Sequence, residues 1–222
     1  MCSCVAHATS SILEYHAKQD NSSQKLSTAF IYGIQKKVCG RDGSGMYLRD
    51  ACKIVNLYGD MLESDCPGNR EVPKAHAIAE SAFDDDSKLS RAAFFKVLSY
   101  VKLRNNEEIK HALMNHGPVL ASVKWFKTFE CVDGKLTGEQ IGDAGHHAVM
   151  IYGWNKEGFL VQNSWGTYWG DKGRFILPYE IPVRESWQLV DADDGDIVKP
   201  MRGPIINFIY KIINYLLNLF NK

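Results

Sequence analysis

Cysteine, histidine and asparagine residues that could act together in nucleophilic catalysis lie far apart in this sequence. Apolar residues recur at helical spacing from Val5 to His16, so we expect a helix that begins at Cys4, with Ser3 as its N-cap. The positive end of a helix dipole favours the thiolate, which is the nucleophilic form of cysteine. Cys4 is therefore the candidate nucleophile.

A cysteine nucleophile needs a base that takes its proton and a group that orients the base. His147 begins a strand-like run that extends to Trp154, and Asn163 directly follows a second run at residues 159–162. Residues 155–158 join the two runs, so antiparallel pairing would bring Asn163 beside His147. This set of residue types points to acyl transfer by a cysteine.

Helical patterns come first in the chain and strand patterns follow. Helices are predicted over residues 48–57, from near Ser90, and over 106–116, with stops at Gly59 and at Gly117. Strand-like runs are predicted over residues 119–123, 147–154 and 159–162. Helices followed by strands do not build alternating βαβ units, so the order predicts an α+β fold with two lobes and a cleft between them.

Composition and missing motifs exclude several classes of protein. The chain has 222 residues, enough for a sizeable core, and its 26 basic residues balance its 26 acidic ones, which argues against a nucleic-acid partner. It contains no phosphate-binding loop, no HExxH and no GxSxG motif. No secretory signal is visible, so we expect an intracellular protein whose sparse cysteines stay reduced.

Other interpretations of the same residues remain open at this point. Cys2, Cys4 and His7 are soft metal ligands, but no fourth ligand is indicated, and we expect neither a metal nor a cofactor. Taken alone, Cys4 fits a small buried hydrophobic residue and Trp165 a core aromatic. His146 fits a hydrogen-bonded core histidine.

Three segments of the chain resemble the papain-like (cathepsin-type, peptidase C1) family of cysteine peptidases, in the order that the family has them. Residues 2–6 resemble its nucleophile segment, 145–149 its histidine segment and 163–170 its asparagine segment. The loop 43–46 resembles the glycine-bearing loop that pairs with the substrate backbone. The resemblance covers about residues 1–190 and is nearest to divergent, microbial-type members.

The resemblance implies a papain-like two-lobe fold and hydrolysis of peptide bonds. A helical lobe is expected over residues 1–104 and an antiparallel barrel-like lobe over 105–197, with the active-site cleft between them. The substrate would be a peptide or protein. Its carbonyl carbon would be attacked by Cys4, and a thioester would form and then be hydrolysed.

The resemblance also implies a role for individual residues. Cys4 would be the nucleophile, His147 its general base and later its acid, and Asn163 the group that orients the imidazole. Trp165 would shield the hydrogen bond between Asn163 and His147 from water, which strengthens that bond. The residues expected to contact substrate are Ser44, Gly45 and Trp165.

One family residue has no counterpart in the sequence as given. The glutamine of the family's oxyanion hole lies six residues before the nucleophile, which here falls before Met1. The backbone N–H of Cys4 is then the expected oxyanion donor, and loss of one side-chain donor lowers a rate by roughly 100- to 1,000-fold. The alternative is a catalytically reduced binding protein that attaches to a membrane or partner through its C-terminal helix.

The last segment of the chain, residues 198–222, differs from the rest. Between residues 205 and 220 all side chains are apolar or aromatic except those of Asn207, Lys211, Asn214 and Asn218. Their spacing places them on one narrow face of an amphipathic helix. Sixteen residues span only ~24 Å, less than the ~30 Å of a bilayer core, so a membrane span is strained. The alternatives are a helix that lies in a membrane surface or anchors the chain there, contact with a partner, and packing on its own domain.

Overall fold

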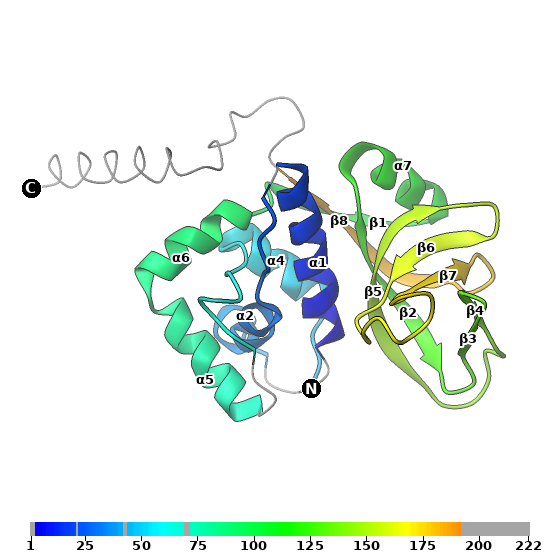
Figure 1. Ribbon diagram of the computed structural model, residues 1–222, viewed down its shortest axis with the longest axis horizontal. Coiled ribbons are helices and arrows are strands. Elements are labelled where there is room, and N and C mark those ends of the chain that lie inside the picture. Colours follow the sequence, from blue (N-terminus) through cyan, green and yellow to red (C-terminus); the bar gives the residue numbers. More distant parts are fainter. Residues whose placement is uncertain (1–2, 21, 42–43, 69–71, 192–222) are drawn as a thin grey trace, which may run out of the picture. The chain divides into compact units, whose positions relative to one another are not determined.

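The computed structural model describes residues 3–20, 22–41, 44–68 and 72–191 (Figure 1). The predicted amphipathic helix at residues 205–220 therefore lies outside the described residues. Within the described chain, no helix combines the length and apolar character needed to cross a membrane. The helical elements of the first part are α1 (Cys4–Gln19), α2 (Thr28–Gly33), α3 (Gln35–Cys39), α4 (Leu48–Leu57), α5 (Val72–Phe83), α6 (Asp86–Ala92) and the short 3-10 helix η1 (Ala93–Phe95).

Helix α1 begins at Cys4, as predicted. Its buried residues recur at helical spacing, and they include Val5, Ala8, Ile12 and Leu13. Ser3 occupies the N-cap position, but its hydroxyl accepts no capping hydrogen bond. Its backbone carbonyl accepts from the N–H of His7 at 3.0 Å. The start of the helix is therefore held by the backbone.

The predicted helix over residues 48–57 is confirmed as α4, and the chain leaves it through Gly59 at φ +81°. A helix start near Ser90 is wrong, because α6 begins at Asp86. The Asp85 side chain accepts from the backbone N–H groups of Ser87 and Lys88, and this cap fixes the earlier start.

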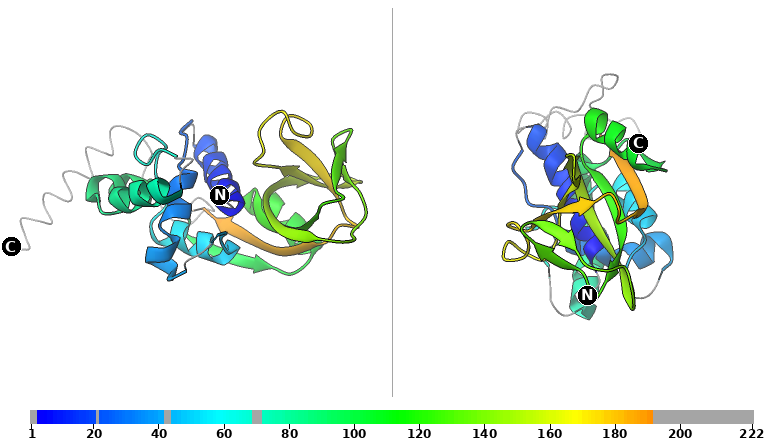
Figure 2. Two further views of the ribbon diagram at one scale, coloured as in Figure 1. Left: turned by 90° about the horizontal axis from the view of Figure 1, so that it is seen from below. Right: turned by 90° about the vertical axis from the view of Figure 1, so that its right-hand side faces the viewer.

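Eight strands form one strongly curved sheet in the described chain (Figure 2). In chain order they are β1 (Ser99–Leu103), β2 (Val119–Phe126), β3 (Glu130–Val132), β4 (Lys135–Thr137), β5 (Ala144–Trp154), β6 (Gly158–Gln162), β7 (Arg174–Pro178) and β8 (Val183–Val190). The order across the sheet is β1-β8-β2-β5-β6-β7-β4-β3, and neighbours are antiparallel except β4 and β7. The predicted strands at 119–123, 147–154 and 159–162 are confirmed within β2, β5 and β6.

Helix α7 (Asn106–His116) precedes β2 and confirms the helix predicted there. The side chain of Asn105 caps it by accepting from the N–H of Glu108 at 2.9 Å. Gly117, at φ +83°, ends it. The chain is thus helical first and strand-rich second, which is an α+β arrangement.

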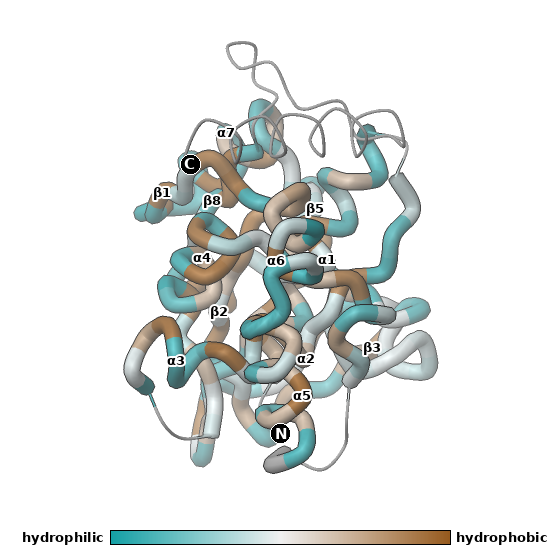
Figure 3. Tube along the Cα trace, turned by 90° about the vertical axis from the view of Figure 1, so that its left-hand side faces the viewer, coloured by the Kyte–Doolittle hydropathy of each residue, from teal (hydrophilic) through white to brown (hydrophobic). Residues whose placement is uncertain are grey.

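The core consists of two hydrophobic clusters that share strands β2 and β5. Side chains alternate between the two faces of a strand. One face packs with the helices through Leu120, Ala148 and Met150. The other packs within the curved sheet, and it includes Ala121, Val123, Val149 and Ile151. In Figure 3, hydrophobic and hydrophilic stretches interleave along the helices, as expected when each helix buries one face.

Asp60 is a fully buried carboxyl group beneath α1. Its Oδ2 accepts from the Ser10 hydroxyl at 2.8 Å, and its Oδ1 accepts from the Met61 N–H at 2.8 Å. Burial raises the pKa of Asp60 well above its ordinary value, and the nearby carboxylates Glu14 and Glu63 raise it further. The folded protein therefore retains a proton that the unfolded chain releases.

This proton makes the stability depend on pH. An unfolded aspartate ionises near pH ~3.9, so above that pH the unfolded state binds fewer protons than the folded state. The contribution of the Asp60 proton to the free energy of unfolding is complete below that pH, and it is lost as the pH rises toward the raised pKa of Asp60. Asp60→Asn keeps an oxygen that accepts from the Met61 N–H, its amide N–H can donate to the Ser10 hydroxyl oxygen, and it removes this dependence. In urea unfolding, the free-energy difference between wild type and Asp60→Asn should change by up to about 1.4 kcal/mol per pH unit in this range.

An exposed carboxylate supplies the control for this measurement. Asp143→Asn removes a largely exposed carboxyl group, whose side chain is 82% accessible. The stability of Asp143→Asn should follow the wild-type pH curve. Parallel curves for wild type and Asp60→Asn would contradict a protonated Asp60.

Candidate active site

Helix α1 carries Cys4 at its first residue and lies along strands β2 and β5. Helix α1 packs against both strands, and Figure 1 shows it running alongside β5. The last turn of α1 meets the chain just before β2: a side-chain atom added at Gly117 would lie 3.0 Å from Cε1 of Tyr15 and 3.7 Å from Cε1 of His16. The chain directions of α1 and β2 are opposite, so β2 leads from this contact back toward the start of α1 (Figure 1).

Simple geometry then gives the level of Cys4 along the strands. The helix from His16 back to Cys4 is ~18 Å long at ~1.5 Å per residue. The same length of strand, at ~3.3 Å per residue, leads from Gly117 to about Val123. Val123 pairs with His147 of β5. Cys4 is half-buried and packs against the cluster that contains Ala148, the next residue after His147.

His147 and Asn163 are hydrogen-bonded to each other. His147 Nε2 lies 2.8 Å from Asn163 Oδ1, and the two residues are only 7% and 8% exposed. The predicted pairing of β5 with β6 is confirmed, and it places Asn163 just beyond the end of β6. The Asn163 N–H donates to the carbonyl of Gly173 at 2.9 Å, which fixes its backbone.

A second hydrogen bond determines which nitrogen of His147 carries the proton. The backbone N–H of Ser164 donates to the same side-chain atom of Asn163 at 2.8 Å. A backbone N–H can only donate, so that atom is the amide oxygen, and the oxygen can only accept. Nε2 of His147 must therefore carry a hydrogen, which leaves a lone pair on Nδ1 in the neutral ring.

Burial lowers the pKa of His147 below its ordinary value, although the hydrogen bond to Asn163 partly offsets this. The imidazole is therefore neutral at neutral pH. A neutral imidazole with a free Nδ1 can accept a proton, as a general base must.

Two tryptophans enclose the imidazole. Trp165 stacks on it, with ring centroids 4.7 Å apart and the planes at 29°. Trp125 meets it edge-on, with centroids 5.1 Å apart. Trp165 also remains 46% exposed, so it covers the imidazole and still faces solvent. The sequence interpretation missed Trp125, which could have been found by pairing the run at residues 119–123 with the run that begins at His147.

His146 and His147 point to opposite faces of β5. His146 is exposed, so its interpretation as a core residue is wrong. Alternation along the strand explains this, because His147 occupies the face that the curved sheet encloses.

Ser44 and Gly45 lie in the loop before α4. Gly45 has φ +105°, a conformation that favours glycine, and no atom lies within 4 Å of the position a side chain would take. Its N–H donates to the Tyr32 hydroxyl at 3.5 Å, and Ser44 is exposed. In the described chain these two residues share no hydrogen bond with His147 or Asn163, so the direct contacts join His147, Asn163 and Trp165 only.

The other described cysteines are less suited to nucleophilic chemistry. Burial raises the pKa of Cys66 to about 11 and that of Cys52 further still. Burial also raises the pKa of Cys39 and of Cys131. All four, like Cys4, are free thiols in the described chain. The raised pKa keeps each of these four side chains in the protonated thiol form, which is a poor nucleophile.

The remaining interpretation of the sequence concerned a metal site at Cys2, Cys4 and His7. Cys2 lies outside the described residues, and within them no group of three or more histidine, cysteine, aspartate or glutamate side chains is placed to hold a metal.

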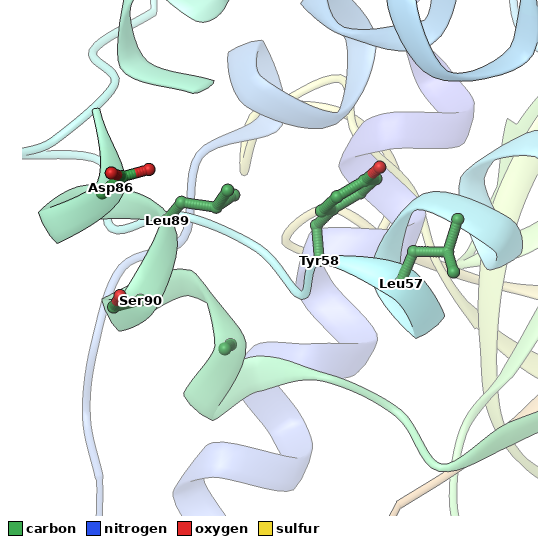
Figure 4. Close-up of a pocket in the computed structure, with 6 residues that line it drawn as sticks. Leu57, Tyr58, Asp86, Leu89 and Ser90 are labelled. Atoms are coloured by element: carbon green, nitrogen blue, oxygen red, sulfur yellow. The ribbon is translucent and has the colours of Figure 1, made fainter. Parts of the chain in front are cut away.

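A separate pocket of about 310 Å³ lies on the helical part (Figure 4). It is lined by Leu57, Tyr58, Asp86, Leu89, Ser90 and Ala93.

Solved structures have the same fold. Xylellain, a cysteine protease from Xylella fastidiosa, superposes with a TM-score of 0.74 at 21% identity and covers 86% of this chain and 80% of its own. A cysteine protease of Carica candamarcensis gives a TM-score of 0.62 at 18% identity, over 86% of this chain and 89% of its own. The predicted papain-like α+β fold is confirmed for the described residues.

Several proteins are similar in sequence. An uncharacterized peptidase C1-like protein of Acanthamoeba polyphaga mimivirus is 30% identical over 92% of this chain and 69% of its own length. Cathepsin B-like cysteine proteinase 1 of Haemonchus contortus is 25% identical over 60% of this chain and 42% of its own. Cathepsin B-like cysteine proteinase 6 of Caenorhabditis elegans is 34% identical over 47% of this chain and 29% of its own. The matches span less than half of each nematode protein.

A family model described as papain family cysteine protease matches residues 1–181. The match contains Cys4, His147 and Asn163, together with most residues of both hydrophobic clusters. The chain therefore belongs to the papain family of cysteine proteases.

Proposed function

We propose that this protein hydrolyses peptide bonds, with Cys4 as nucleophile, His147 as general base and acid, and Asn163 as the residue that orients the imidazole. The observation that supports it best is the 2.8 Å hydrogen bond from His147 Nε2 to Asn163 Oδ1. It leaves Nδ1 free on a neutral ring at the level of Cys4. In this proposal the lobe 1–104 supplies the nucleophile and the lobe 105–197 supplies the base.

The proposed reaction has two halves. The Cys4 sulfur attacks the peptide carbonyl carbon, and its proton passes to His147 Nδ1. The carbon–nitrogen bond then breaks, the protonated His147 returns the proton to the leaving amine, and a thioester remains on Cys4. Water, deprotonated by His147, attacks the thioester carbon, the carbon–sulfur bond breaks and the acid is released, and His147 returns its proton to the Cys4 sulfur.

The developing oxyanion lies at the start of α1. The first N–H groups of a helix have no partner within the helix, so the N–H of Cys4 can donate to the oxyanion. One such donor typically lowers the activation barrier by about 3 kcal/mol. The helix dipole acts in the same direction.

Trp165 and the loop at Gly45 complete the proposed site. The Trp165 ring covers the imidazole, so water is kept from the hydrogen bond to Asn163. The open space at Gly45 lets a substrate backbone approach the loop, with Ser44 exposed beside it. Peptides or proteins are the proposed substrates, because the curated nematode relatives are named cysteine proteinases.

Thiol labelling tests this proposal against a protein that only binds peptides. We expect iodoacetamide at neutral pH to alkylate Cys4 at least about tenfold faster than Cys39 or Cys131, since burial raises the pKa of both. Peptide mass spectrometry over a time course measures each rate. His147→Ala should remove most of the advantage of Cys4. Equal labelling of the three thiols would favour the binding-only alternative.

A further inference from the structure

Strands β2 and β5 carry a short exposed segment immediately beyond the start of α1. On the face that packs with the helices, Leu120, Ser122, Ala148 and Met150 are all buried. Lys124 and His146 come next on the same face. Both are less buried than the preceding residues, because Lys124 is half-buried and His146 is exposed. The cover supplied by α1 therefore stops at the level of Cys4.

Lys124 and His146 are direct cross-strand partners. Side chains at such positions have Cβ atoms about 5 Å apart and meet on one face. We call them the Lys124–His146 pair. Both side chains carry nitrogen donors, so a carboxylate placed between them would accept from both.

No carboxylate of the described chain fills that place. The Lys124 ammonium lies over the Phe126 ring, 4.8 Å from its centroid. Glu185, opposite Ser122 on the same face, directs Oε1 to the indole N–H of Trp187 at 2.7 Å. Lys127, three residues after Lys124, is paired with Asp143 at 2.9 Å.

We propose that the Lys124–His146 pair binds a substrate carboxylate, so that the protein prefers peptides with aspartate or glutamate within two residues of the scissile bond. The inference rests on the proposed function, because it takes Cys4 as the place of cleavage. A lysine ammonium and an imidazole N–H can both donate to one carboxylate. The partly buried setting of Lys124 strengthens the attraction relative to bulk water.

Matched peptide substrates measure this preference. Internally quenched peptides that differ only by glutamate or glutamine at one of the four positions around the scissile bond are compared by kcat/KM. We expect glutamate to be preferred about fivefold at one position or more, and the preference to shrink between about 0.02 and 0.5 M NaCl. Lys124→Gln combined with His146→Gln should abolish it, and Lys124→Glu should reverse it.

Lys127→Glu is the matched control. It changes the net charge by the same amount as Lys124→Glu, but at an exposed residue outside the pair. It should leave the glutamate preference of the wild type unchanged. Equal use of glutamate and glutamine by the wild type, or an equal effect of Lys127→Glu, would overturn the proposal.

Binding measurements keep this test separate from catalysis. The same peptides, carrying a fluorophore, are titrated with the Cys4→Ala variant and followed by anisotropy. Tighter binding of a glutamate peptide, lost in Lys124→Gln, supports the pair even if no variant hydrolyses peptides. Equal affinities refute the pair even if the wild type is an active peptidase.

Discussion

Cys4→Ala is expected to lower kcat/KM for peptide hydrolysis by about 10⁴-fold or more, with the fold unchanged. Alanine has no atom that can form the thioester, so the covalent route is lost and only binding and oxyanion stabilisation remain. Cys4 is half-buried at the first residue of α1, and removing its sulfur leaves the helix pattern intact. Hydrolysis of an internally quenched peptide mixture measures the loss, and circular dichroism checks the fold.

Cys39→Ala is the matched control for this variant. Cys39, like Cys4, is a free and partly exposed thiol, and burial raises its pKa. We expect Cys39→Ala to keep wild-type activity. Activity retained by Cys4→Ala would contradict the assignment of the nucleophile, whereas a loss in both variants would indicate damage to the helical part.

His147→Ala is expected to lower kcat/KM by about 10²- to 10⁴-fold, the usual contribution of a general acid and base. It should also change the pH profile. Burial lowers the pKa of His147, so the imidazole stays neutral, and able to accept a proton, to a lower pH than a free histidine. The acid limb of wild-type activity should therefore lie below pH 6.5.

Profiles of kcat/KM between about pH 4 and 8 test this second prediction. The limb assigned to His147 should be absent from the residual activity of His147→Ala. His111→Ala removes an exposed histidine of α7 and should leave the profile unchanged. A wild-type limb centred at or above pH 6.5 would contradict a buried, neutral imidazole.

Local signals in the sequence predicted part of the fold. The apolar spacing of α1, the Gly59 stop after α4 and the Gly117 stop after α7 are short-range patterns, and all three elements form where they were predicted. Helix α2 was not predicted, because its six residues are nearly all buried and show no amphipathic period. The cap at Ser27, whose side chain accepts from the Phe30 N–H at 3.1 Å, supports it.

The edge strand β1 shows what pairing adds. Its residues are mostly exposed, so the sequence carries little strand pattern there. It forms because it pairs with β8, with Ser99 opposite Val190. A contact between residues so distant in sequence cannot be read from local composition.

The sequence by itself determined the family, the residues proposed for chemistry and the pairing of His147 with Asn163, because antiparallel strands joined by a short turn have a nearly fixed register. Only the tertiary structure decided what surrounds them. Trp125 reaches the imidazole because β2 pairs with β5, and the same pairing sets the half-buried Lys124 opposite the exposed His146. These features depend on contacts between elements, which local periodicity does not encode.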